Sequence, residues 1–76
     1  MKKYAVIDTD ITAGAVENIK VFESKEEAIR RADYFWSMLT SREQEKRDSF
    51  IVGLIEVDEH NEPIDGEVIE VIKTFK

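Results

Sequence analysis

Residues 24–39 read SKEEAIRRADYFWSML and predict the one long helix of the chain. Ser24 followed by Glu27 has the spacing of a capping box, in which the hydroxyl accepts a hydrogen bond from a first-turn amide and the carboxylate reaches back to the cap. At about 100° per residue, one stripe of this helix is apolar. Its members are Ala28, Ala32, Phe35 and Leu39, widened by Ile29 and Trp36. The stripe predicts the face that packs on a sheet.

Four segments with β-strand character flank the helix, at residues 3–8, about 18–23, 49–57 and about 68–75. The polar residues 58–66, which include the only proline, predict a hairpin or slightly longer connection between the last two. Thr40 and Glu43 repeat the capping-box spacing, so residues 41–47 form a polar turn or a short helix. The order β-β-α-β-β predicts one α+β, two-layer domain over residues 1–76, a mostly antiparallel four-stranded sheet with one helix on one face.

Length and composition narrow the possible functions. The chain has 76 residues, no cysteine and a formal net charge of -6. Most enzyme folds need about 100 to 200 residues, and without cysteine there are no disulfides, thiol catalysis or thiolate metal sites. Neither a signal-peptide core nor a membrane span is present in the sequence, so we expect a soluble cytoplasmic protein that does not enter membranes. Chains this short often gain burial by oligomerisation, which makes a homodimer a reasonable expectation.

Apolar side chains occupy both faces of three predicted strands, although one helix covers only one face. A solvated second face would alternate with polar residues, and large exposed apolar patches usually mark interaction sites. We therefore expect the uncovered face to bind a second copy or another protein. The representative contact residues are Val6, Ile55, Val68 and Ile72. The alternative is that these residues are half exposed and are present for their strand propensity.

Tyr34 and Met38 lie one helical turn apart and away from the apolar stripe, with Arg31 and Arg42 near them. Because tyrosine, methionine and arginine are enriched in interfaces, this pair is a second candidate contact with a partner. Equally, both side chains could cover a sheet edge and complete the core.

The charge distribution supports a different function. Residues 56–70, from Glu56 to Glu70, contain seven acidic residues and no lysine or arginine. Such a hairpin repels phosphate backbones, so we expect no direct nucleic-acid binding. It could instead imitate DNA and inhibit a DNA-binding protein, or it could simply be a solvated acidic surface.

Residues 8–12 read DTDIT and are similar to the D-x-D-x-T signature of haloacid-dehalogenase-type phosphatases. In that family the first aspartate attacks phosphorus, the second acts as acid and base, and both help to hold magnesium. The family also requires a downstream lysine, a further acidic pair and a parallel doubly wound core, which 76 residues cannot supply. We therefore expect no enzyme and no catalytic residues, with Asp8 and Asp10 in a turn that closes a strand.

No cofactor, metal or small-molecule site is expected. His60 is the only histidine and lies in a polar turn, so zinc has no set of ligands. The three glycines stand alone and form no phosphate-binding loop.

Three stretches, YAVI at residues 4–7, FESKEEA at 22–28 and the segment 36–47, resemble small bacterial proteins of about 75–80 residues with no established function. The resemblance spans most of the chain. It rests on helix caps and core positions, so it implies a fold and transfers no functional residue.

Overall fold

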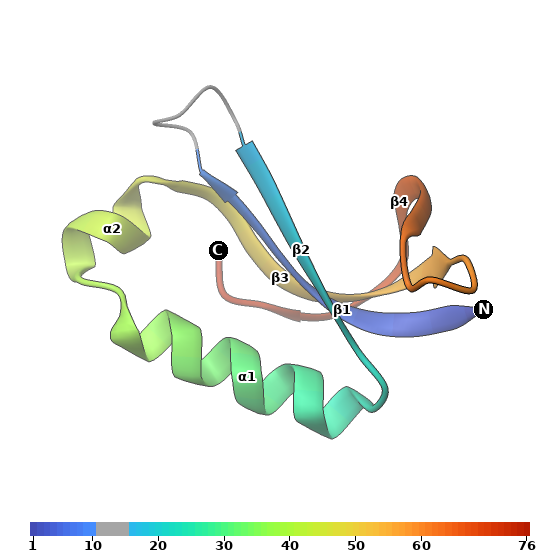
Figure 1. Ribbon diagram of the computed structural model, residues 1–76. Helices are drawn as coiled ribbons and strands as arrows, with labels where there is room; N and C mark the ends of the chain where they lie inside the picture. The colour runs from blue at the N-terminus through green and yellow to red at the C-terminus, as the bar shows by residue number, and fades with distance from the viewer. Residues whose placement is uncertain (11–15) are drawn as a thin grey trace.

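The computed structural model describes residues 1–10 and 16–76 and has the predicted α+β architecture (Figure 1). Four strands form one sheet in the order β2-β1-β3-β4, and every neighbouring pair is antiparallel. The helix α1 covers one face. In chain order the elements are β1 (Lys2–Asp10), β2 (Val16–Phe22), α1 (Lys25–Met38), α2 (Ser41–Glu45), β3 (Arg47–Val57) and β4 (Pro63–Thr74).

Helix α1 begins and ends where the sequence predicts. The Ser24 hydroxyl accepts a hydrogen bond from the Glu27 amide at 3.1 Å, and the Ser24 backbone is extended. At the other end the Leu39 amide donates to the Trp36 carbonyl at 3.2 Å. The short helix α2 follows, with a complete capping box between Thr40 and Glu43. Local sequence signals therefore determine both helices.

The apolar stripe of α1 packs on the sheet and forms what we call the helix-side cluster. Its buried members are Val6, Ala28, Ala32, Phe50 and Val52. The rings of Trp36, Phe50 and Phe75 meet beside them with centroid separations of 5.2 to 5.9 Å. Phe75 reaches this position because its amide donates to the Phe50 carbonyl at 2.8 Å, which continues the pairing of the last two strands to the chain end.

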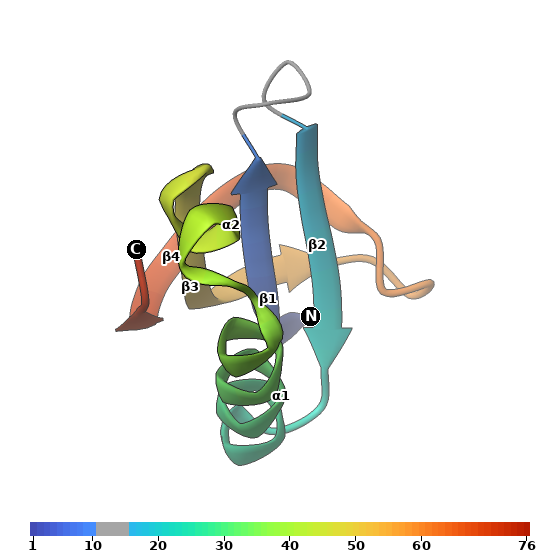
Figure 2. The same ribbon diagram turned by 90° about the vertical axis from the view of Figure 1, so that its left-hand side faces the viewer.

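The opposite side of the sheet holds a second apolar group, which we call the far-side cluster. Its buried members are Ala5, Ile7, Ile55 and Val57, with Ile19, Val21, Ile51 and Val68 packed around them. Residues of both edge strands, β2 and β4, therefore contact one cluster, although β1 and β3 separate them in the sheet. Figure 2 shows the reason: the sheet curls, and β4 passes behind β1 and β2.

Irregular pairing of β4 accompanies this curl. Its register with β3 shifts at three places, and the extra residues lie on β4. Each extra residue reverses the alternation of side chains between the two faces. For this reason Val68 packs in the far-side cluster while Ile72 packs in the helix-side cluster, and Ile69 and Val71 are exposed. The strand also begins at Pro63, earlier than predicted, and the turn shortens to residues 58–62, held by the Asp58 carboxylate.

Burial within one chain corrects the predicted positions of the contact residues on the uncovered sheet face. Ile55 is 2% exposed because the curl covers it, so it cannot contact another protein on this surface. Val6 and Ile72 were placed on the uncovered face, and this is wrong: both pack in the helix-side cluster. Val68 does lie on the far side, half-buried against the far-side cluster.

Gly53 makes the close approach of β4 possible. A Cβ atom at this position would lie 2.8 Å from Cγ1 of Val68, closer than van der Waals contact allows. The residue paired with Gly53 on β1 is Ala5, another small residue. Small residues at the centre of the far face therefore let β4 curl toward that face.

We predict that Gly53→Ala lowers the free energy of unfolding by about 1–3 kcal/mol, because the new methyl group forces Val68 outward. The loss should be smaller when the same change is made in a Val68→Ala background, and urea denaturation of the four chains measures this coupling. Equal losses in both backgrounds would show that Val68 is not the group that resists the methyl.

Candidate functional site

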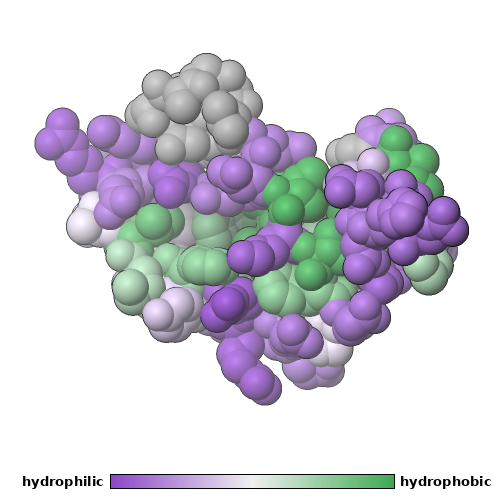
Figure 3. Space-filling view, viewed as in Figure 1, coloured by the Kyte–Doolittle hydropathy of each residue, from purple (hydrophilic) through white to green (hydrophobic). Residues whose placement is uncertain are grey.

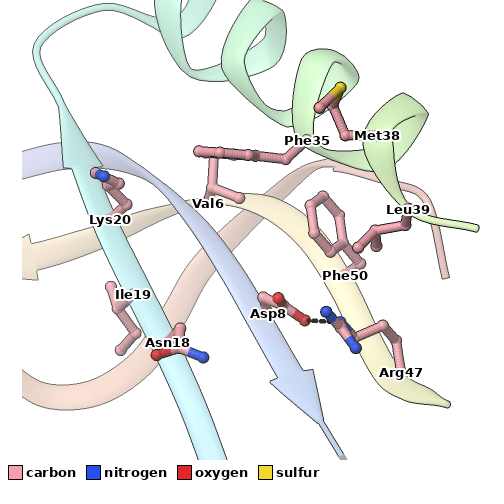
Figure 4. A pocket seen from close by; sticks show the side chains of 10 residues that line it. All are labelled: Val6, Asp8, Asn18, Ile19, Lys20, Phe35, Met38, Leu39, Arg47 and Phe50. Carbon is pink, nitrogen blue, oxygen red and sulfur yellow. Dashed lines mark ion pairs between the residues drawn. The ribbon is translucent and has the colours of Figure 1, made fainter. Parts of the chain in front are cut away.

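A hollow in the surface lies between α1 and the edge strand β2, toward the end of α1 (Figure 4). Its volume is about 520 Å³. Residues from α1, β1, β2 and the start of β3 line it, so it exists only because these elements converge. The lining residues are Val6, Asp8, Asn18, Ile19, Lys20, Phe35, Met38, Leu39, Arg47 and Phe50.

Apolar side chains form much of the wall. Phe35 and Leu39 belong to the core stripe of α1, and each leaves part of its surface facing the hollow. Met38 stands at the rim and is 65% exposed. Val6 and Phe50 lie beneath, nearly fully buried. The hollow is therefore suited to an apolar side chain inserted from outside.

An ion pair closes the end of the hollow nearest α2. Arg47 Nε lies 2.8 Å from Asp8 Oδ1, and the two side chains are 14% and 22% exposed. Both are charged groups held largely out of water, where an ion pair interacts more strongly than on the surface. Asp8 thus joins β1 to the start of β3.

A second hollow, of about 320 Å³, continues the first along the same side of α1. It is lined by Phe22 at the end of β2 and by Glu27, Arg30, Arg31 and Tyr34 on the helix. Tyr34 is 53% exposed. Both hollows are lined by residues of α1 and β2, and together we call them the α1–β2 groove. Figure 3 shows apolar side chains gathered in the middle of this face, with hydrophilic side chains around its margins.

Two cations flank the aromatic ring at the centre of the α1–β2 groove. Lys20 Nζ of β2 lies 5.9 Å from the Phe35 ring centroid, and the Arg31 guanidinium of α1 lies 5.3 Å from it. Both cations are exposed, and within the described part of the chain neither forms an ion pair. The groove is therefore apolar at its centre and locally positive, in a chain that is acidic overall.

The predicted contact residues divide into two groups. Tyr34 and Met38 both line the α1–β2 groove, whereas Ile55, Val68 and Ile72 lie elsewhere and Val6 is only a buried part of its floor. Sequence reasoning missed Phe35, which it assigned to the core alone, and Lys20. Periodicity identifies the helix face that packs in the core, but it does not show which part of a core ring remains exposed. The contact of Lys20 with Phe35 depends on how α1 crosses β2.

The structure also describes His60 and part of the phosphatase-like stretch. His60 is exposed and lies 3.5 Å from the Glu59 carboxylate in the turn. Among residues 1–10 and 16–76, no three histidine, cysteine, aspartate or glutamate side chains are grouped to hold a metal ion. The prediction that Asp8 and Asp10 lie in a turn is wrong, because both continue β1 and pair with its two neighbours. Asp8 is in the ion pair with Arg47. Ile11 and Thr12 lie outside the described residues. No helix in the described part of the chain is long and apolar enough to cross a membrane.

The short helix α2 ends at Glu45, two residues before β3 begins at Arg47. Gln44 Nε2 donates to the Trp36 carbonyl at 2.9 Å, which ties α2 to the last turn of α1.

The Thr40 amide donates to Glu43 Oε1 at 3.1 Å. This bond lowers the pKa of Glu43 below its ordinary value of 4.5 and is the largest cause of the shift. The hydrogen bond with the Thr40 hydroxyl and the charges of Arg47 and Lys46 act in the same direction.

No protein-family model, curated protein or solved structure matches this chain. Its function must therefore be inferred from the α1–β2 groove itself.

We predict that Arg47→Met lowers the free energy of unfolding by about 1–3 kcal/mol, because the carboxylate of Asp8 loses a charged partner while remaining largely buried. Arg42→Met is the matched control, since Arg42 is exposed on α2. Chemical denaturation compares the three chains. If the two variants are equally stable, the ion pair contributes nothing to the fold.

The capping box at Thr40 and Glu43 should make stability depend on pH in a defined direction. Because folding lowers the pKa of Glu43, the box stabilises the chain above the ordinary pKa of glutamate and loses this contribution as pH falls through the lowered pKa. Glu43→Gln keeps the shape and removes the charge. The stability difference between parent and variant should be present at neutral pH and disappear as pH falls through the lowered pKa of Glu43, as measured by urea unfolding across pH. A difference that grows on acidification contradicts this assignment.

Proposed function

We propose that this domain is a non-catalytic protein–protein interaction module that docks a partner through the α1–β2 groove. The observation that carries the proposal is the position of Tyr34 and Met38: two exposed side chains of interface-rich types line a groove with an aromatic centre. A monomeric domain does not need either residue for its core. Arg31, which stacks over Phe35, adds a third residue type enriched in interfaces.

The geometry supports a protein ligand better than a small molecule. Both hollows are open to solvent and follow the length of the helix, whereas small-molecule sites enclose most of their ligand. Apolar anchors within a polar margin are the usual arrangement of a docking surface, in which a few central side chains supply most of the binding energy. On this proposal Met38 and Tyr34 are such anchors.

A second candidate is an acidic inhibitor that acts through residues 56–70. It is favoured by the exposure of the carboxylates in and after the turn. The exposed residues are Asp58, Glu59, Glu62, Asp65, Glu67 and Glu70. Ile64 is exposed among them, 60% accessible, and could contact an apolar spot on a basic partner. This surface lies on β4 and the turn before it, distinct from the groove.

We predict that Tyr34→Glu combined with Met38→Glu abolishes capture of partners by the tagged full chain, because charge at the anchors opposes apolar docking. Ile64→Glu is the matched control, equally exposed on β4, and should capture normally. Circular dichroism and thermal unfolding establish that all variants fold. Capture should weaken only in part at high salt, because salt screens the exposed charges of the groove but not its apolar contacts.

The same assay distinguishes the second candidate. If Glu59→Lys with Glu62→Lys removes capture, and capture by the parent fails as salt rises, the acidic segment is the functional surface. If the Tyr34 and Met38 variant captures as well as the parent, the groove proposal is wrong.

A further inference from the structure

Strand β2 forms a regular edge of the sheet. It pairs with β1 from Tyr4 opposite Phe22 to Asp10 opposite Val16 without a register shift. In the part of the chain that the structure describes, no strand lies on its other side. An edge strand presents a row of backbone N–H and C=O groups that can pair with another chain. The groove therefore has hydrogen-bonding backbone along one wall.

The other edge of the sheet is much less suited to pairing. Strand β4 shifts register against β3 at three places, and bulges of this kind twist an edge and interrupt its row of hydrogen-bonding groups. Exposed carboxylates of Asp65, Glu67 and Glu70 also lie along it. Of the two edges, β2 is the one that can accept a further strand.

Side chains of a strand added to β2 would reach the groove. Phe22 packs in the helix-side cluster while Ile19 and Val21 pack in the far-side cluster, so Lys20 and Asn18 share the face of α1. Directly opposed residues of an antiparallel or parallel pair lie on the same face. Alternate residues of the added strand would thus point toward Phe35 and Met38, where the hollow of about 520 Å³ can take a large apolar side chain.

The positive charge of the groove favours one kind of added strand. Lys20 and Arg31 stand over the Phe35 ring, and neither has a carboxylate partner among the described residues. Arg30 and Arg31 also line the second hollow, against Glu27 alone. A segment with carboxylates beside its apolar anchor would place negative charge at these cations. A basic segment would meet the same cations with like charge.

We propose that the partner of the α1–β2 groove is an extended acidic segment of another protein, which adds to β2 as a fifth strand and inserts one bulky apolar side chain beside Phe35 and Met38. This inference rests on the proposed docking function and specifies its ligand. Backbone hydrogen bonds would supply affinity, and the hollow and the two cations would supply specificity.

The probe is a synthetic ten-residue peptide in which glutamate alternates with valine and one central glutamate is replaced by phenylalanine, so that the phenylalanine and the glutamates share the face of α1. Titrated into the isotope-labelled full chain, it should bind and slow the amide hydrogen exchange of residues 17–21. Two peptide controls isolate the chemistry. Lysine in place of glutamate should weaken binding at least about tenfold, and backbone N-methylation of alternate residues on the pairing edge should do the same.

Variants of the chain test the same contacts. Lys20→Glu and Met38→Glu should each lower the affinity for the peptide at least about tenfold, while Ile64→Glu should change it less than about twofold. Lys20, Met38 and Ile64 are all exposed, so thermal unfolding should show that each variant retains the fold.

Several outcomes would overturn the inference. Equal binding of the N-methylated peptide would mean docking without strand addition, and protection of β4 in place of β2 would move the site. Protection of β2 amides without peptide, rising with protein concentration alongside a dimer in light scattering, would make a second copy the occupant. If the acidic peptide fails while the Tyr34 and Met38 variant still loses partner capture, strand addition is wrong and the docking function stands.

Discussion

At Gly53 the backbone of β3 carries no side chain, and Val68 of β4 occupies the space next to it. This contact is the constraint on which the rest of the structure depends, since it lets β4 pass close behind the centre of the sheet. Both edge strands then contribute to the far-side cluster, and Ile55 and Val57 become buried within one chain. The domain thereby builds two apolar layers with only one long helix.

Because β4 covers part of the far side of the sheet, that side offers less apolar surface to a partner. A flat sheet with one helix would expose its second face to a partner, but the curled sheet covers that face with its own β4. An open apolar surface is instead found at the junction of α1 and β2. The exposed Tyr34 and Met38, the partly open Phe35 and the cations beside it all lie along this junction.

Local signals in the sequence predict the elements well. The cap at Ser24, the apolar stripe of α1, the capping box at Thr40 and the alternation of β1 and β3 all have the predicted positions or faces, because each depends on neighbours a few residues away. The curl could not be predicted this way. It depends on register shifts in β4, which turn Ile72 to the helix side while Val68 stays on the far side. It also depends on the contact of Gly53 with Val68, which joins two strands. Tyr34 and Met38 of the site could be recognised from the sequence, because they are apolar or aromatic residues outside the core stripe. The role of Lys20 could not, because it depends on how α1 crosses β2.

The sequence separation of paired residues is small in the two outer strand pairs and large in the central pair. β1 pairs with β2, and β3 with β4, across short connections, but β1 and β3 join residues as distant as Lys2 and Glu56. Closing so long a segment is slower and loses more chain entropy than closing a hairpin. Two locally formed hairpins, with the helix between them, would thus meet late along the β1–β3 seam, and the rate of folding of this small domain would be governed by that encounter.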